Sequence, residues 1–182
     1  IRKRTLEYDN VMNKQREAIY GLRRQLLEGL QTKQAILNMS YDAMAAEILR
    51  FRNEENPKDF ASWNHAGFLY WLRRAIPFIE LEGLDPREFS DPEDYIAALM
   101  PRVEKAYDFK TEIFGETLHA DIARFLTVRT IDEIWRDHLL AIDELREGIH
   151  LRSYAQLNPL TEYQREATTM FDEMMYNVNK SV

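Results

Sequence analysis

The sequence predicts an all-α protein with a long helix, a small helical subdomain and a long antiparallel two-helix hairpin. Its 182 residues are 45% hydrophobic, which is enough for a sizeable core. No Gly or Pro precedes Gly21, and none lies between Gly115 and Gly148. These uninterrupted stretches are rich in residues that favour helices, and no stretch alternates apolar and polar residues long enough to predict a sheet.

Residues 1–34 are expected to form one long amphipathic helix that ends near Gly29. Their apolar stripe repeats at intervals of three and four residues: Tyr8, Val11, Gln15, Ile19, Leu22 and Leu26. A helix of roughly 25 to 30 residues has a stripe longer than any short partner helix. It is therefore expected to lie across several partners as a scaffold.

Residues 35–115 are broken by prolines and predict a small helical subdomain. Asp91 before Pro92 has the chemistry of a helix start, because the carboxylate accepts free amide protons and proline is tolerated at the first helical position. Pro101 is expected to end or kink that helix. Aromatic residues gather between Phe60 and Trp71. They favour a core, although such a group could also line a groove.

Residues 116–182 carry two apolar stripes that predict a helical hairpin. Gly148 is expected to end the first helix, and Asn158-Pro159 to delay the second. The predicted linker contains Ile149, Leu151, Tyr154 and Leu157, although a tip in water is normally rich in Gly, Asn and Ser. The tip therefore either contacts another molecule or folds back on its own helices.

Charge and motifs exclude several classes of function. The net charge is −7, and only residues 1–34 have more basic than acidic side chains, so nucleic-acid binding is not expected. There is no cysteine and no phosphate-binding loop. The pattern E-x-x-H occurs at Glu116–His119 and Glu147–His150, at opposite ends of one expected helix. These two patterns could not share a metal pair, and no metal site is predicted at His138.

Two sequence blocks resemble the SecA family, the ATPase motors of the bacterial preprotein translocase. The first is LEYDNVMNKQRE at residues 6–17, followed by Ile19-Tyr20. The second contains GIHLRSYAQ at residues 148–156, with further matching residues around it: Thr130, Ile131, Asp132, Trp135, His138, Leu139, Pro159, Leu160, Glu162 and Tyr163. Departures from the family pattern are Asn10, Ser153 and Leu157-Asn158.

The resemblance implies a C-terminal part of a SecA protein. Residues 1–34 would be the helical scaffold, 35–115 the helical wing, and 116–182 the two-helix finger with the returning scaffold helix. The family's nucleotide-binding domains, with ATP and magnesium, are expected before this region, and its zinc-binding tail after it. This chain alone is therefore expected to be no enzyme and to hold no cofactor.

The resemblance also implies a function and its residues. The chain would couple ATP-driven domain motion to preprotein movement through the Sec membrane channel, and restrain the ATPase when idle. Its partners would be the SecA motor domains, the channel and the preprotein, at the cytoplasmic face of the inner membrane. The fingertip would be Tyr154, Ile149, Leu151 and Arg152, and the interdomain packing residues Trp135, Leu6, Tyr8 and Val11. The alternative is a stand-alone helical module that binds proteins without motor activity.

Overall fold

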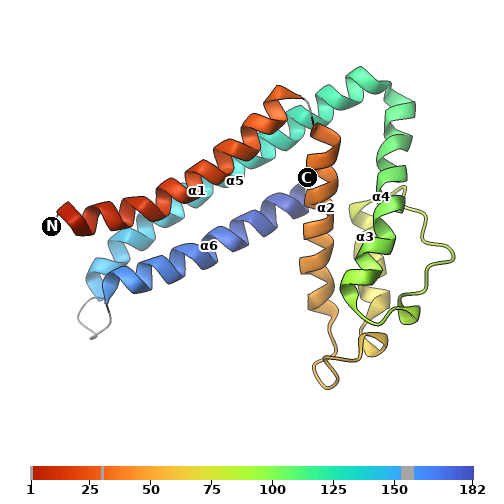
Figure 1. Ribbon diagram of the computed structural model, residues 1–182, viewed down its shortest axis with the longest axis horizontal. Helices are drawn as coiled ribbons and strands as arrows, with labels where there is room; N and C mark the ends of the chain where they lie inside the picture. Colours follow the sequence, from red (N-terminus) through yellow and green to blue (C-terminus); the bar gives the residue numbers. More distant parts are fainter. Residues whose placement is uncertain (1, 30, 153–157) are drawn as a thin grey trace. The chain divides into compact units, whose positions relative to one another are not determined.

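The computed structural model describes residues 2–29, 31–152 and 158–182, with backbone alone at 2–6 and 150–152. All regular elements in these ranges are helical, which confirms the predicted fold class (Figure 1). The α-helices are α1 (Arg2–Glu28), α2 (Thr32–Ile48), α3 (His65–Ala75), α4 (Pro92–Phe114), α5 (Glu116–Arg152) and α6 (Pro159–Ser181). Three short 3₁₀ turns are η1 (Leu49–Phe51), η2 (Phe60–Ser62) and η3 (Pro86–Glu88). Of the described helices, none has the length and apolar character needed to cross a membrane.

The chain divides into two compact units. One, the three-helix unit, comprises Ile1–Gln31 and Arg124–Val182, and the other, the middle unit, comprises Thr32–Ala123. Most of the first and last predicted segments thus belong to one unit, but residues 116–123, at the start of α5, belong to the middle unit.

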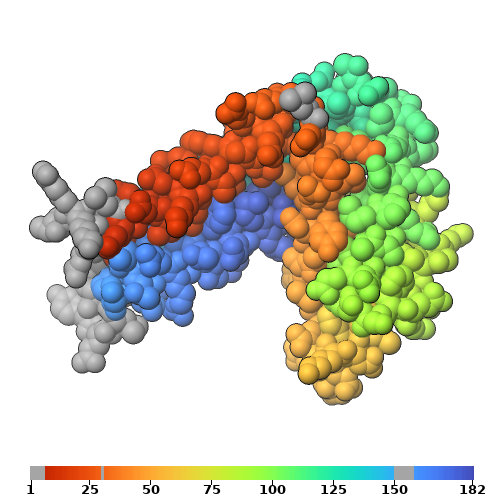
Figure 2. Space-filling view, in the orientation of Figure 1, coloured from red at the N-terminus to blue at the C-terminus, as the bar shows by residue number. Residues whose placement is uncertain are grey.

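In the three-helix unit, α1 lies beside α6, and their surfaces adjoin in the space-filling view (Figure 2). The predicted stripe of α1 is confirmed, because Tyr8, Gln15, Ile19 and Leu26 are buried. The predicted stop is also confirmed. Gly29 has a φ of 71°, a left-handed conformation that glycine adopts without strain, and its N–H bonds to the carbonyl of Leu26 at 3.1 Å.

The hairpin helices differ from the prediction in two places. α5 does not end at Gly148 but continues to Arg152. Burial of Ile149 just beyond it outweighs the cost of about 1 kcal/mol for glycine inside a helix. The apolar stripe also fails at the start of α5, where Leu118, Ile122 and Phe125 are exposed. α6 begins as predicted, with the Asn158 side chain accepting the N–H of Leu160 at 3.1 Å.

The middle unit packs α2 against α4 around one apolar core. Phe60, Trp63 and Phe68 are buried in it and Trp71 packs against it, which confirms these four as core, whereas Tyr70 is 66% exposed. Asp91 caps α4 as predicted, its carboxylate accepting the N–H of Asp94 at 2.9 Å. Of the two outcomes expected at Pro101, an end or a kink, the end is wrong, because α4 continues to Phe114. Leu99 and Val103 on either side of the proline are buried, and their packing offsets one lost hydrogen bond.

Candidate functional site

The predicted packing residues meet in the three-helix unit. Tyr8 is 6% exposed and belongs to a cluster, here called the end cluster, with Ile142, Ile149, Tyr163 and Ala167. Val11 packs against this cluster. Trp135 is also buried. α1, α5 and α6 all contribute to the end cluster, so Tyr8 and Val11 lie in a core between helices of one unit.

The predicted fingertip residues are described only in part. Ile149 is 3% exposed and packs in the end cluster, so it is a core residue of the three helices and not an open contact surface. Leu151 and Arg152 lie in the last turn of α5, where only the backbone is described, as it is for Leu6 in α1. Tyr154 lies outside the described residues.

At the end cluster, aromatic and charged groups tie α1 to both other helices. The ring centroids of Tyr8 and Tyr163 are 4.8 Å apart at 53°. The Arg146 guanidinium lies 5.9 Å from the Tyr8 ring centroid, and its Nη1 is 3.4 Å from Oδ1 of Asp9. Burial raises the pKa of the Tyr163 hydroxyl, an effect that the nearby Arg146 charge opposes. Tyr163 is therefore neutral at physiological pH.

One layer further along α1, Gln15 forms a buried network with α5 and α6. Its Nε2 donates to the carbonyl of Ala167 at 3.0 Å, and its Oε1 lies 2.8 Å from Nε2 of His138. An amide oxygen only accepts, so Nε2 of His138 must carry the proton. The His138 ring is 5.4 Å from that of Trp135 and 5.8 Å from that of Phe171. Burial in these surroundings lowers the pKa of His138, so the neutral imidazole is favoured.

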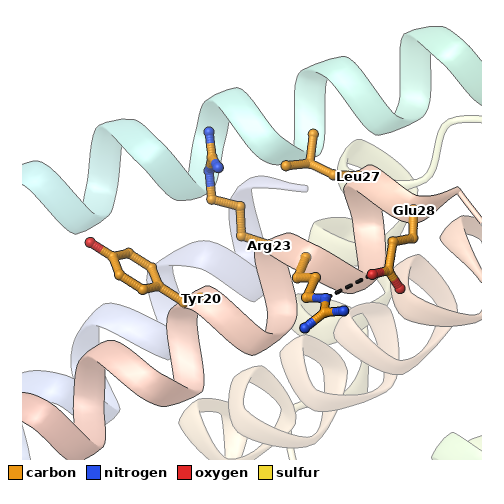
Figure 3. A pocket seen from close by; sticks show the side chains of 5 residues that line it. Tyr20, Arg23, Leu27 and Glu28 are labelled. Carbon is orange, nitrogen blue, oxygen red and sulfur yellow. Dashed lines mark hydrogen bonds and ion pairs between the residues drawn. The ribbon is translucent and has the colours of Figure 1, made fainter.

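A third layer holds a two-point ion pair. Nε and Nη2 of Arg23 lie 2.9 and 3.2 Å from the two carboxylate oxygens of Asp132 on α5. This hydrogen bond, together with the charge of Asp132, raises the pKa of Arg23. Next to it is an open hollow of about 240 Å³, lined by Tyr20, Arg23, Arg24, Leu27 and Glu28 (Figure 3). Arg24 is bound there to Glu28 at 2.7 Å.

The three layers fix the direction of the helices. Residue numbers rise along α1 from Asp9 through Gln15 to Arg23. The numbers of their partners on α5 fall in the same order, from Arg146 through His138 to Asp132. α5 is therefore antiparallel to α1. In contrast, the α6 partners rise from Tyr163 to Ala167 as the α1 residues rise from Tyr8 to Gln15. α6 thus runs parallel to α1, and α5 and α6 form the antiparallel hairpin that the sequence predicts.

The contacts described here are packing contacts, hydrogen bonds and ion pairs between helices. Within the described ranges, no three His, Cys, Asp or Glu side chains are grouped as metal ligands. His119, in one of the two E-x-x-H patterns, is instead buried in the middle unit with its Nδ1 2.7 Å from the Thr111 hydroxyl. These contacts hold α1, α5 and α6 together.

Comparison with known proteins identifies the family. The whole chain, residues 1–182, matches the sequence model described as the SecA Wing and Scaffold domain. The chain belongs to this family. The resemblance found in the sequence is thereby confirmed over the full length, including the middle segment.

SecA relatives agree with this identification. Proteins named protein translocase subunit SecA are 39% identical over 178 residues in Koribacter versatilis, 37% over 182 in Geobacter sulfurreducens and 35% over 183 in Syntrophomonas wolfei. These alignments cover 96, 98 and 100% of this chain but only 17, 20 and 22% of the relatives. The chain thus spans about a fifth of the length of these SecA proteins.

Sequence reasoning missed the central pair of this SecA wing and scaffold chain. Gln15 is predicted on the buried stripe, and His138 is considered as a metal ligand and as a residue of the family pattern, which leaves their hydrogen bond unforeseen. The sequence does contain an indication that Gln15 has a buried partner. Gln15 is the polar member of an otherwise apolar stripe, and a polar side chain at such a position requires a buried partner.

Proposed function

We propose that this chain is the part of a SecA translocase that couples ATP-driven motion of the motor domains to preprotein movement through the Sec channel. The match of the whole chain to the SecA wing and scaffold family is the observation that carries the proposal. In this proposal ATP and magnesium bind the motor domains of the full-length protein, and zinc binds its tail. The protein works at the cytoplasmic face of the inner membrane, attached through the channel.

The three-helix packing gives the proposal a physical basis. α1 has 27 residues, which corresponds to about 40 Å of helix. It is joined to α5 at its Asp9, Gln15 and Arg23 levels and to α6 at Tyr8 and Gln15. A movement applied to α1 would therefore be transmitted to the hairpin as a whole, because the buried contacts of Tyr8 and Gln15 join α1 to both α5 and α6.

Within this proposal the preprotein meets the end of the hairpin at Leu151, Arg152 and Tyr154. A tyrosine ring offers apolar area and one hydrogen-bonding group, so it can contact polypeptides of any sequence. Ile149 supports this end from within the core. Leu6, Tyr8, Val11 and Trp135 serve as packing residues of the scaffold.

A cross-linking experiment tests the fingertip role. Residues 1–182 replace the matching part of a cysteine-free full-length SecA relative, with one thiol introduced by Tyr154→Cys and one in a stalled preprotein. A disulfide that requires ATP and the channel is expected. The matched control is Glu173→Cys, at an exposed position of α6, which is expected to remain unlinked. Cross-linking at position 173 but not at position 154 would contradict the proposed fingertip.

The proposed restraint of the ATPase has a separate test. This chain is added in trans to a SecA motor that lacks the corresponding region, without preprotein, and ATP turnover is followed. Turnover is expected to fall as the chain binds. Unchanged turnover at saturating chain, with binding verified by co-sedimentation, would contradict the restraint while leaving the fingertip proposal intact.

A further inference from the structure

Among the described residues, Gln15 forms side-chain hydrogen bonds that join all three helices of the three-helix unit. It binds Ala167 of α6 at 3.0 Å and His138 of α5 at 2.8 Å. Gln15 is 6% exposed and His138 5%, so both groups are shielded from water. Trp135 and Phe171 lie against the His138 ring. The network is polar inside an apolar surrounding.

Apolar packing by itself defines the register of these helices only weakly. Their buried residues recur about once per turn, so a slip of one turn, about 5.4 Å, would set one apolar row against the next. The ion pairs Asp9–Arg146 and Arg23–Asp132 contribute little discrimination. Their side chains are 40 to 45% exposed, and water can solvate the separated charges.

Water cannot replace the hydrogen-bond partners of Gln15 and His138 in this way, because both side chains are buried. After a slip, the Gln15 amide and the Nε2–H of His138 would remain in the core without partners. Unpaired polar groups shielded from water are strongly disfavoured, more so than a paired group is favoured. The native register is the arrangement in which both groups are satisfied.

We propose that Gln15 and His138 are positioning residues that fix the register in which α5 and α6 dock on α1. A single buried polar position is known to select register among helices that apolar packing alone would leave free to slide. The inference rests on the packing of the three-helix unit and does not depend on the proposed function.

The test measures a distance along the helices in the 182-residue chain. The chain contains no cysteine, so thiols introduced by Arg24→Cys on α1 and Glu144→Cys on α5 can be spin-labelled selectively at exposed positions. Pulsed electron paramagnetic resonance is expected to give one narrow distance. In the double variant Gln15→Leu with His138→Leu, helical circular dichroism is expected to persist. A second distance, displaced by about 5 Å, is expected to appear.

Two further variants make the result specific. Replacing the exposed pair, Asp9→Asn with Arg146→Gln, is expected to leave the single distance unchanged. His138→Gln keeps an N–H donor and is also expected to give a single unchanged distance. A second distance in this variant would contradict the role of the hydrogen bond. One unchanged distance in a folded double-leucine variant would overturn the proposal. Loss of the helical signal in the double-leucine variant would also overturn the proposal, because the network would then serve stability and not register.

Discussion

Tyr8 and Tyr163 pack ring against ring, with centroids 4.8 Å apart, although one lies near the start of the chain and the other near its end. Both side chains are buried in the end cluster. This contact brings α1 and α6 together beside the last turns of α5. The start of α6 is thus held in place by Tyr8, which lies near the other end of the sequence.

Replacing Tyr8 by alanine is expected to destabilise the protein by about 3 to 5 kcal/mol, the usual cost of removing a large buried aromatic side chain. The loss comes from its apolar area and from the cavity left beside Tyr163. Urea unfolding followed by circular dichroism measures it. Tyr20→Ala is the matched control, since Tyr20 lies on the same helix and is 54% exposed. Equal losses in the two variants would contradict the assignment of Tyr8 to the core.

Stability is expected to fall as pH is lowered from 7.5 to 5.5. Burial lowers the pKa of His65, His119 and His138 in the folded state. In the unfolded chain a histidine has a pKa of about 6.5. Above that pH the three histidines are neutral in the folded and the unfolded protein, so their titration does not change stability. Below it the unfolded chain binds protons more readily than the folded chain, so protonation favours unfolding until the lower folded pKa is reached.

Urea midpoints measured across this pH range check the expectation. His119→Gln should reduce the loss, because one of the three groups no longer titrates and a glutamine can still bond to Thr111. A protein that becomes more stable between pH 7.5 and 5.5 would contradict the direction of these shifts.

The features predicted correctly from the sequence are local ones. The stripe of α1, the stop at Gly29, the cap at Asp91 and the start of α6 after Asn158 each follow from a few neighbouring residues. Helix ends of this kind are determined by backbone groups within one turn, so a short stretch of sequence contains the necessary information.

The features that were missed depend on distant residues. Gly148 and Pro101 disfavour helices locally, but Ile149, Leu99 and Val103 are buried and keep α5 and α4 continuous. The bond between Gln15 and His138 joins residues 123 positions apart, and periodicity shows which face is buried but not which partner covers it. The family, in contrast, was recognisable, because its motifs occupy both ends of the chain.

Alanine is expected to have opposite effects at two glycines. At Gly67 in α3 a Cβ would lie 2.7 Å from two ring carbons of Phe51, and this crowding should cost about 1 to 3 kcal/mol. At Gly21 in α1 a Cβ would meet nothing within 4 Å. Alanine there should stabilise by about 0.5 to 1 kcal/mol, because glycine loses more conformational freedom in a helix. Thermal unfolding measures both. A gain in stability at Gly67 would contradict the crowding there, and a loss at Gly21 would contradict the open space around that position.

The cap of α4 provides the last prediction. The Asp91 carboxylate accepts the N–H of Asp94 at 2.9 Å, and Pro92 occupies the first turn. Asp91→Ala is expected to cost about 1 kcal/mol, because this amide loses its side-chain acceptor and the negative charge near the helix start is removed. Asp59 precedes η2 without making a side-chain cap bond, so Asp59→Ala is the control and should change stability by less than about 0.5 kcal/mol. Urea unfolding distinguishes the two. Equal effects would mean that the loss at Asp91 reflects charge alone, whereas a loss confined to Asp91 supports the hydrogen-bonded cap.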